Sequence, residues 1–357
     1  MSLIGPVKII GCGLIGTSIA LRLKELGIGL ILADTNEMNL RLATDLIGES
    51  NKEVGNPALV IIATPPEAIF EVAKHEFSNN PAALFIEVSG VKSKLLLEVN
   101  SFPELARSFA SVHPMAGRET SGPQSARSDL FESRAWIVSP TKLSSSTALN
   151  AAKDIGIALG STIYELDSGT HDSVVAAISH LPQILSSALG GSLKDESAEH
   201  LNLAGQGLRD VSRLADSEPE LWSSLLLANS KEISPKISEV ISRLSTLNQA
   251  VLSGDRRAII DFFNEGREGR AKIPGKHGLA KRDYTFVPIV IDDKPGGLAR
   301  IFNECAAIEV NVEDLSMEHS PGQEVGLVTL ALSASDAEKL QKHLVSKGFL
   351  AHTPRKN

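Results

Sequence analysis

Cysteine is scarce in this sequence, which has only Cys12 and Cys305 in 357 residues. Because the two lie far apart and neither is spaced like a metal ligand, we expect no disulfide framework, no metal site and a reducing compartment, the cytoplasm. Long apolar runs are also lacking: none approaches the roughly 18 residues of a membrane span. No secretory signal precedes the strand-like residues 7–10. These absences predict a soluble protein with no membrane partner.

An excess of positive charge is the next absence. The formal net charge is −8 at pH 7, and a negative surface does not attract phosphate backbones, so we expect no nucleic acid partner. Apolar residues make up 42% of the sequence and charged residues 22%. These values are typical of globular proteins, and the length allows two or three domains.

Residues 1–166 alternate short apolar runs with helical patterns. The runs fall at residues 7–10, 29–33, 58–63, 83–88, 108–112 and 136–139. This alternation predicts βα units and a mostly parallel sheet, and therefore an α/β domain.

Residues 167–266 have a different texture, because apolar residues recur at helical spacing, as at Val174, Ala177, Ile178 and Leu181. The pattern predicts an all-helical domain. Helices that are apolar on several faces need partners, so we expect a homodimer.

Residues 267–282 are rich in Gly, Lys and Arg and contain Pro274, which predicts a linker. Residues 283–357 then show strand and helix patterns in the order βαββαβ. That order predicts a C-terminal ferredoxin-like sandwich.

The run GCGLIG at residues 11–16 follows the first strand and opens a helix. Gly11 allows a tight turn, Gly13 lets the backbone approach a pyrophosphate, and Gly16 allows close packing of helix and strand. The helix start, at Leu14 and Ile15, receives the negative charge. A strand, a glycine-rich turn and a helix in this order predict a Rossmann-like dinucleotide-binding domain.

Asp34 ends the next apolar run, where a carboxylate can bind the adenosine ribose hydroxyls and repel a 2′-phosphate, so the pattern favours NAD over NADP. A turn without a nucleotide is the alternative. Thr64 and Pro65 follow a later strand and fall at the same cofactor edge. A strand stopped by proline would look the same.

His113 follows the strand-like residues 108–112, where a neutral imidazole can take a proton as a hydride leaves. A structural role is the alternative for an isolated His-Pro pair. His180 lies in an apolar helix. Arg209 and Arg213 are four residues apart and therefore on one helix face, where paired guanidinium groups suit a substrate with carboxylates.

Two alternatives apply to these helical residues. The arginines would also fit a solvated salt-bridge face that includes Asp210. Asp172 could orient His180 or one of the arginines, or it could cap a helix.

Several segments, taken in order, resemble the prephenate/arogenate dehydrogenase family. They are GCGLIG with Asp34, ATPP at 63–66, HPMAG at 113–117, Leu130-Phe131-Glu132 before Trp136, His171-Asp172, SHLP at 179–182 and GLRDVSRLADSEPELW at 207–222. The ordered spacing is far more specific than any one of these motifs.

The resemblance implies NAD-dependent oxidative decarboxylation of prephenate to 4-hydroxyphenylpyruvate, or of arogenate to tyrosine. It implies that His113 is the catalytic histidine, which accepts the proton of the substrate's 4-hydroxyl. Arg213 is implied as the ligand of a substrate carboxylate, Arg209 and His180 as further pocket residues, and Trp222 as an aromatic near the pocket and the dimer interface.

The sequence departs from the family at one strand end. The usual motif reads Asp, two residues, Val, Lys, with serine just before the valine. Here the acid is Glu87, Gly90 precedes Val91, and the serine lies one position earlier, at Ser89. Ser89 is the expected catalytic serine. A nearby acid would favour the ammonium of arogenate, but no acid decides the choice, so we expect prephenate and keep arogenate as the alternative.

The C-terminal residues resemble ACT-type regulatory domains, whose ligand usually lies beside the turn between the first strand and the first helix. Asp293, Pro295, Gly296 and Leu298 fall in that turn, and the implied effector is tyrosine. A purely structural dimerisation domain is the alternative.

Two other functions compete. A β-hydroxyacid or imine reductase would place a catalytic lysine in its first interdomain helix, and the combination of HPMAG with SHLP argues against it. A non-catalytic NAD-binding sensor would not need His113, Arg209 and Arg213.

Overall fold

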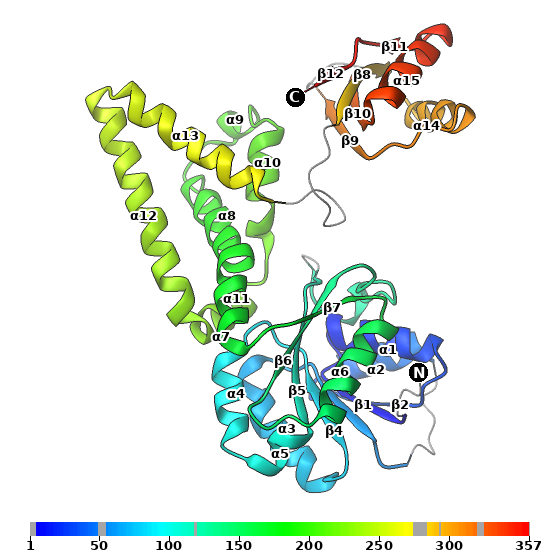
Figure 1. The fold of residues 1–357 in the computed structure, drawn as a ribbon, viewed down its shortest axis with the longest axis vertical. Helices are drawn as coiled ribbons and strands as arrows, with labels where there is room; N and C mark the ends of the chain where they lie inside the picture. Colours follow the sequence, from blue (N-terminus) through cyan, green and yellow to red (C-terminus); the bar gives the residue numbers. More distant parts are fainter. Residues whose placement is uncertain are drawn as a thin grey trace. The chain divides into compact units, whose positions relative to one another are not determined.

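A computed structural model describes residues 5–48, 55–117, 120–273, 284–292, 294–319 and 325–356. The chain falls into two compact units, residues 1–245 and 246–357. Figure 1 labels their helices and strands.

A seven-stranded sheet organises the first part of the first unit, with strand order β2-β1-β3-β4-β5-β6-β7. Its strands are β1 (Val7–Ile10), β2 (Leu30–Ala33), β3 (Leu59–Ile62), β4 (Leu84–Glu87), β5 (Phe109–Pro114), β6 (Ala135–Pro140) and β7 (Thr162–Glu165). The helices between them are α1 (Leu14–Glu25), α2 (Glu37–Ile47), α3 (Ile69–Asn79), α4 (Ser93–Asn100), α5 (Pro103–Ser108) and α6 (Ser146–Ala158), with short 3₁₀ helices at Pro66–Ala68 and Pro123–Ser125. The predicted α/β domain is confirmed.

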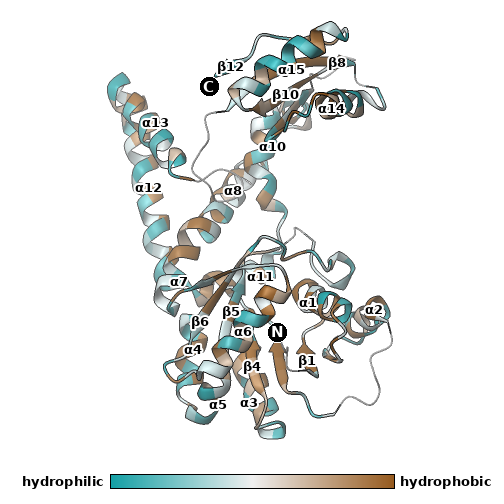
Figure 2. Ribbon diagram, turned by 45° about the vertical axis from the view of Figure 1, so that its right-hand side comes forward, coloured by the Kyte–Doolittle hydropathy of each residue, from teal (hydrophilic) through white to brown (hydrophobic). Residues whose placement is uncertain are grey.

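Helices cover both faces of this sheet. Successive side chains of a strand point to opposite faces, so in β3 Ile61 packs with α1 and α6, whereas Val60 and Ile62 pack with α3, α4 and α5. All four residues of β3 are buried, as expected for a sheet covered on both sides. Strands β1 and β4 of the sheet are brown in Figure 2, the colour of hydrophobic residues.

The sheet is mostly parallel, as predicted, and one strand is the exception. β6 runs antiparallel to β5, with Val112 opposite Val138, while the other neighbours in the sheet are parallel. A parallel connection needs a long crossover, usually a helix. Between β5 and β6 the described residues form only the 3₁₀ helix Pro123–Ser125, so the chain returns in the opposite direction. The sheet also contains β7, a strand that the pattern of apolar runs did not predict.

The predicted helical region is also confirmed. Its helices are α7 (Ser168–Val175), a π-helical turn (Ala176–His180), α8 (Leu181–Ser192), α9 (Ala198–Leu201), α10 (Gln206–Ser212), a 3₁₀ helix (Arg213–Asp216), α11 (Pro219–Ala228), α12 (Ser230–Ser253) and α13 (Arg256–Ala271). The predicted linker began too early, because α13 continues to Ala271. Pro274 lies outside the described residues.

Within the described residues, one helical stretch, Ser168–Ser192, has the length and apolar composition of a membrane span. A single stretch of this kind is a weak indicator, because core helices of soluble proteins have the same character. The stretch is 28% buried. Five of its polar side chains lie in the buried part: His171, Asp172, His180, Gln183 and Ser186.

The second unit contains a small antiparallel sheet in the order β11-β8-β10-β9, with β12 also paired to β8. The strands are β8 (Thr285–Asp292), β9 (Asp314–His319), β10 (Val325–Leu332), β11 (Leu350–Ala351) and β12 (Arg355–Lys356). Helices α14 (Gly297–Ala307) and α15 (Ala334–Ser346) pack on it through a core that includes Ile289, Ile301, Leu330 and Leu340.

Candidate active site

The glycine-rich loop after β1 lies at the switch point of the sheet, where β1 has β2 on one side and β3 on the other. Ligands of open α/β sheets bind at such a point. Gly11 has a φ of +99°, and a Cβ on it would collide with the carbonyl of Ala63. A Cβ on Gly16 would collide with the carbonyl of Gly11, whereas nothing lies within 4 Å of the Cβ position of Gly13. Close packing therefore requires two of the glycines, and the third leaves open space at the start of α1.

Asp34, directly after β2, is held by the main chain. Its Oδ2 accepts the N–H of Cys12 at 2.6 Å, and its Oδ1 accepts the N–H of Asn36 at 2.7 Å. Burial, and then the charge of Asp34, raise the pKa of the Cys12 thiol to about 12. The thiol is therefore uncharged and unreactive, and the carboxylate is fixed beside the glycine-rich loop.

The neighbouring residues also fit a dinucleotide. Leu14 and Ile15 form the first turn of α1 and are half-buried. Thr64 has a buried Oγ1 without a hydrogen-bond partner among the described residues, and Pro65 beside it is exposed. A buried hydroxyl without a partner costs free energy that a ligand can recover. The open helix start, the fixed carboxylate and this hydroxyl fit NAD.

We expect Asp34→Ser to weaken NAD binding by about tenfold, since it removes charged hydrogen bonds to the ribose, and to strengthen NADP binding because the repulsion of a 2′-phosphate is lost. Titration calorimetry with both nucleotides measures the change. Asp45→Ser is the matched control, because Asp45 is exposed on α2. Equal loss of both nucleotides in Asp34→Ser would contradict a selective role.

A row of hydrogen bonds leads to the imidazole at the end of β5. His113 Nδ1 lies 2.9 Å from Nε2 of His171, and His171 Nδ1 lies 2.8 Å from Oδ1 of Asp172. Asp172 also accepts the N–H groups of Lys92, at 2.9 Å, and Ser93, at 2.7 Å. It therefore caps α4, where the helix N-terminus favours negative charge. Of the roles considered for Asp172, orientation of His180 or an arginine is wrong, because its partner is His171.

His180 ends the π-helical turn between α7 and α8. Pro182, two residues later, has no N–H and cannot donate a helical hydrogen bond. Single π-helical turns inside α-helices often occur at functional sites. His180 Nδ1 lies 3.2 Å from Nδ2 of Asn229, which also donates to the carbonyl of Asp172 at 2.9 Å. Trp222 packs edge-on against His180, with ring centroids 5.9 Å apart. The structure thus brings two of the predicted pocket residues together.

A fully buried ion pair lies beside these histidines. Lys92 Nζ lies 2.6 Å from Oε1 of Glu87, 2.7 Å from the carbonyl of Ser89 and 2.6 Å from the carbonyl of Val112. Glu87 also accepts the hydroxyl of Ser111 and the N–H of Ser89. All three donors of the ammonium group are used, and they fix the strand end that carries the imidazole.

Gly90 rather than Ser89 faces that imidazole. The hydroxyl of Ser89 donates to the carbonyl of Val91 at 3.0 Å. A Cβ on Gly90 would lie 3.7 Å from Nε2 of His113 and 3.0 Å from Leu225. The serine hydroxyl therefore bonds within its own loop, and its catalytic role stays a prediction.

The site favours neutral histidines. Burial, followed by the charge of Lys92 and the neighbouring histidines, lowers the pKa of His113 well below its ordinary value of 6.5. Burial also lowers the pKa of His171 and of His180. Burial alone would raise the pKa of Asp172, but the hydrogen bonds it accepts lower it overall. At neutral pH the row therefore consists of two neutral imidazoles and a carboxylate.

The two arginines lie on exposed positions. Arg209 donates to the carbonyl of Ala204 at 3.2 Å, and Asp210 accepts from Gln206 rather than from an arginine in the described contacts. The prediction of one continuous helix face was wrong, because α10 ends at Ser212 and Arg213 begins a 3₁₀ helix. Helices often tighten into 3₁₀ geometry at their ends.

Sequence reasoning assigned no site role to Lys92, His171 or Asn229. A lysine in the run VKSK looks like a surface residue. The acid and the lysine that flank Ser89 and Gly90, five positions apart, were the available signal for the ion pair. The adjacent His171 and Asp172 were a signal for the row, but nothing local indicates the partner of Asn229.

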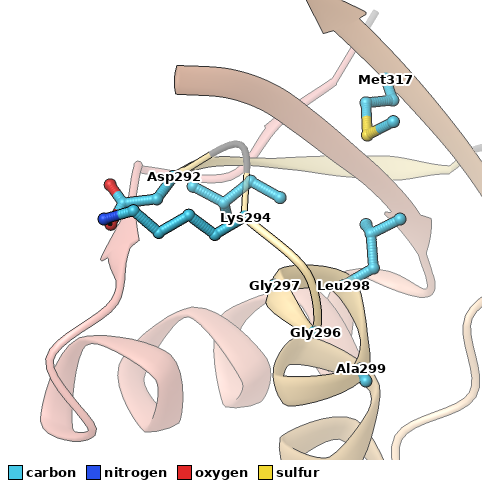
Figure 3. Close-up of a pocket in the computed structure, with 8 residues that line it drawn as sticks. Asp292, Lys294, Gly296, Gly297, Leu298, Ala299 and Met317 are labelled. Atoms are coloured by element: carbon cyan, nitrogen blue, oxygen red, sulfur yellow. Dashed lines mark hydrogen bonds and ion pairs between the residues drawn. The ribbon is translucent and has the colours of Figure 1, made fainter. Parts of the chain in front are cut away.

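The C-terminal unit contains a pocket of its own. This pocket, at the start of α14, has a volume of about 230 Å³ and is lined by Ile291, Asp292, Lys294, Gly296, Gly297, Leu298, Ala299 and Met317. Figure 3 shows its lining side chains. Of the predicted regulatory residues, Gly296 and Leu298 line this pocket. Pro295 is not among its described lining residues, and Asp293 lies outside the described part of the chain. Lys294 Nζ and Asp292 Oδ2 form an exposed ion pair at 3.2 Å.

Comparison with known proteins matches two adjoining family profiles. Residues 19–165 match the nucleotide-binding domain of prephenate dehydrogenase, and residues 167–265 match its dimerization domain. The Streptomyces niveus protein "Probable prephenate dehydrogenase NovF" is 28% identical over 97% of this chain and 99% of its own.

Solved structures agree. Prephenate dehydrogenase from Aquifex aeolicus, in complex with hydroxyphenyl propionate and NAD⁺, is 26% identical and has a TM-score of 0.66, covering 74% of this chain and 96% of that one. Arogenate dehydrogenase from Synechocystis, at 24% identity and a TM-score of 0.61 over 74% of this chain and 99% of that one, shares the fold. The chain belongs to the prephenate dehydrogenase family and is an NAD-dependent dehydrogenase.

Proposed function

We propose that this chain catalyses the NAD-dependent oxidative decarboxylation of prephenate to 4-hydroxyphenylpyruvate. The observation that carries the proposal is the position of His113. It lies at the carboxyl end of β5, in the sheet whose switch point holds the dinucleotide loop, and its ring is kept neutral by its surroundings. A neutral imidazole at that edge can accept a proton as a hydride departs.

NAD, when bound, supplies the hydride acceptor. The hydride leaves the ring carbon that bears the 4-hydroxyl, and the hydroxyl proton passes to His113. The bond to the ring carboxylate then breaks, and its electron pair enters the ring as carbon dioxide leaves. Aromatisation provides the driving force, so the protein has to position the reacting groups and accept one proton.

Arg213, with Arg209, is the proposed partner of the substrate carboxylates, because guanidinium groups bind carboxylates in a bidentate manner. Trp222 and His180, already in contact, form the proposed pocket wall. We also propose that the functional unit is a homodimer. Large exposed apolar side chains in the helical region support a partner, among them Ile178 (62% exposed), Leu203 (85%) and Leu227 (77%).

The proposed regulator is tyrosine, bound in the pocket at the start of α14. The unit has the element order β8-α14-β9-β10-α15-β11, which fits the proposed ACT-type domain. Gly296 has a φ of +87° and Gly297 begins the helix. The N–H of Gly297 donates to the carbonyl of Lys294, so the first-turn amides that follow it are the proposed partners of an amino-acid carboxylate. Leu298 and Met317 supply apolar surface for a side chain.

The test mixes the purified protein with NAD and follows NADH absorbance after addition of prephenate or arogenate, each with and without tyrosine. We expect fast reduction with prephenate and its suppression by tyrosine. Reduction with arogenate alone would move the substrate assignment. No reduction with either substrate, despite measured NAD binding, would overturn the proposed activity and favour a sensor.

A further inference from the structure

The row from Asp172 through His171 to His113 has a fixed direction. Asp172 is ionised, because its pKa is lowered by the hydrogen bonds it accepts. A carboxylate can only accept hydrogen bonds, so Nδ1 of His171, 2.8 Å from Oδ1, carries a proton. The ring of His171 is fully buried and its pKa is lowered. It is therefore neutral at pH 7, and its Nε2 is an acceptor.

His113 must donate in the next hydrogen bond. Its Nδ1 lies 2.9 Å from the acceptor Nε2 of His171, so the proton of the neutral ring is on Nδ1 and the lone pair is on Nε2. Gly90 lies on the Nε2 side of the ring, where even an added Cβ would stay 3.7 Å away. The lone pair on Nε2 therefore lies on the side of the ring that faces a glycine, which has no side chain to cover it.

We propose that Asp172 and His171 are positioning residues, which hold the neutral His113 in the tautomer whose Nε2 accepts the substrate's hydroxyl proton. The identification of this proton as the proton of the substrate's hydroxyl rests on the proposed function. When Nε2 takes the proton, the Nδ1–H bond to His171 is retained, so the row does not rearrange. The opposite polarity, with the proton of His171 on Nε2, would place the proton of His113 on its own Nε2 and block it.

The other end of the row is anchored to the main chain. Asp172 accepts the N–H groups of Lys92 and Ser93 at the start of α4. The side chain of Lys92 holds the carbonyl of Val112, the residue before His113. The row is therefore tied at both ends to one rigid sheet edge, as accurate placement of a base requires.

Asp172→Asn tests the proposal because an amide nitrogen can only donate. In this variant the amide nitrogen replaces either Oδ2, which faces Ser93, or Oδ1, which faces the N–H of Lys92 and Nδ1 of His171. In both cases the negative charge that keeps the proton on Nδ1 of His171 is lost. An amide nitrogen in place of Oδ1 also reverses the row. We expect kcat to fall roughly 100-fold or more, with KM and NAD affinity within about threefold of the parent. Asp167→Asn is the matched control: the side chain of Asp167 caps α7 through Gly169 and Thr170. Its bond to His171 is made by the main-chain carbonyl, which the substitution keeps.

A pair of substitutions at His171 separates polarity from packing. In His171→Gln the amide nitrogen can donate to Asp172 while the amide oxygen accepts from His113, so the direction of the row is kept. His171→Leu keeps apolar bulk and removes both bonds. We expect the Gln variant to retain at least about ten times the kcat of the Leu variant. Equal kcat in the two variants would overturn the proposal.

Nitrogen-15 NMR of the wild-type protein at pH 7 reads the tautomer directly, with His113→Asn used to assign the signal. We expect Nδ1 of His113 to be protonated and Nε2 to be unprotonated. A proton on Nε2 would overturn the inference even if the enzyme turns over prephenate. The expected tautomer without turnover of prephenate or arogenate would instead count against the proposed function alone.

Discussion

His113→Asn is expected to abolish most turnover while NAD binding survives. The side-chain amide of asparagine can take the place of Nδ1 and still donate to Nε2 of His171, 2.9 Å away in the parent. The substitution therefore removes little except the acceptor Nε2. Loss of a positioned general base costs about 100- to 10,000-fold, so kcat should fall within that range. Steady-state NADH formation and calorimetry with NAD are the two measurements.

His75→Asn provides the control for this substitution. His75 lies exposed on α3, and its ring is hydrogen-bonded to the side chain of Asn79 on the same helix, so the variant should keep full activity. A His113→Asn enzyme that retained more than about a tenth of the parental kcat would show that another group accepts the proton. If NAD binding were lost as well, the substitution would have disturbed the fold and the kinetic result would not bear on the base.

The largest expected loss of stability follows from Lys92→Met. The side chains of Lys92 and Glu87 are both 0% exposed, and methionine fills the space without replacing the charge. Glu87 would keep the Ser111 hydroxyl and the Ser89 N–H, but its buried charge would have no counterion. Removal of one partner of a buried pair costs about 3–5 kcal/mol. Urea unfolding followed by the fluorescence of Trp136 and Trp222, which both belong to this unit, measures the change.

Two further variants define the cause. Adding Glu87→Gln to Lys92→Met removes the uncompensated charge and should recover part of the loss. Lys74→Met breaks an exposed pair with Glu71 and should change the free energy of unfolding by less than about 1 kcal/mol. If Lys92→Met were as stable as Lys74→Met, the buried pair would not contribute to the sheet edge that carries the base.

Local signals in the sequence were sufficient for the nucleotide-binding part. Apolar runs, glycines at fixed offsets and Asp34 lie within a few elements of one another, and steric limits on Gly11 and Gly16 apply whatever the rest of the chain does. The position of His113 at a strand end was also local information. The structure has Gly11, Gly16, Asp34 and His113 at the positions in the fold that the sequence predicts.

Other features depend on contacts between distant parts of the chain. His113 and His171 are 58 positions apart, and Asp172 reaches α4 across 80 positions, so no local pattern could pair them. Lys92 looks like a surface lysine because burial of its charge becomes tolerable only when Glu87 and two carbonyls surround it. The direction of β6 could not be predicted either. Apolar runs mark where strands lie, but the direction of a strand depends on whether the connection before it contains a crossover helix.

The cap that Asp172 places on α4 has two parts. One is the pair of main-chain N–H groups of Lys92 and Ser93, which any amino acid other than proline supplies. The other is the side chain of Ser93, which also hydrogen-bonds Asp172 and helps to lower the pKa of its carboxyl group. Ser93 is therefore a position at which the charge of this carboxylate can be adjusted while the helix stays attached to it.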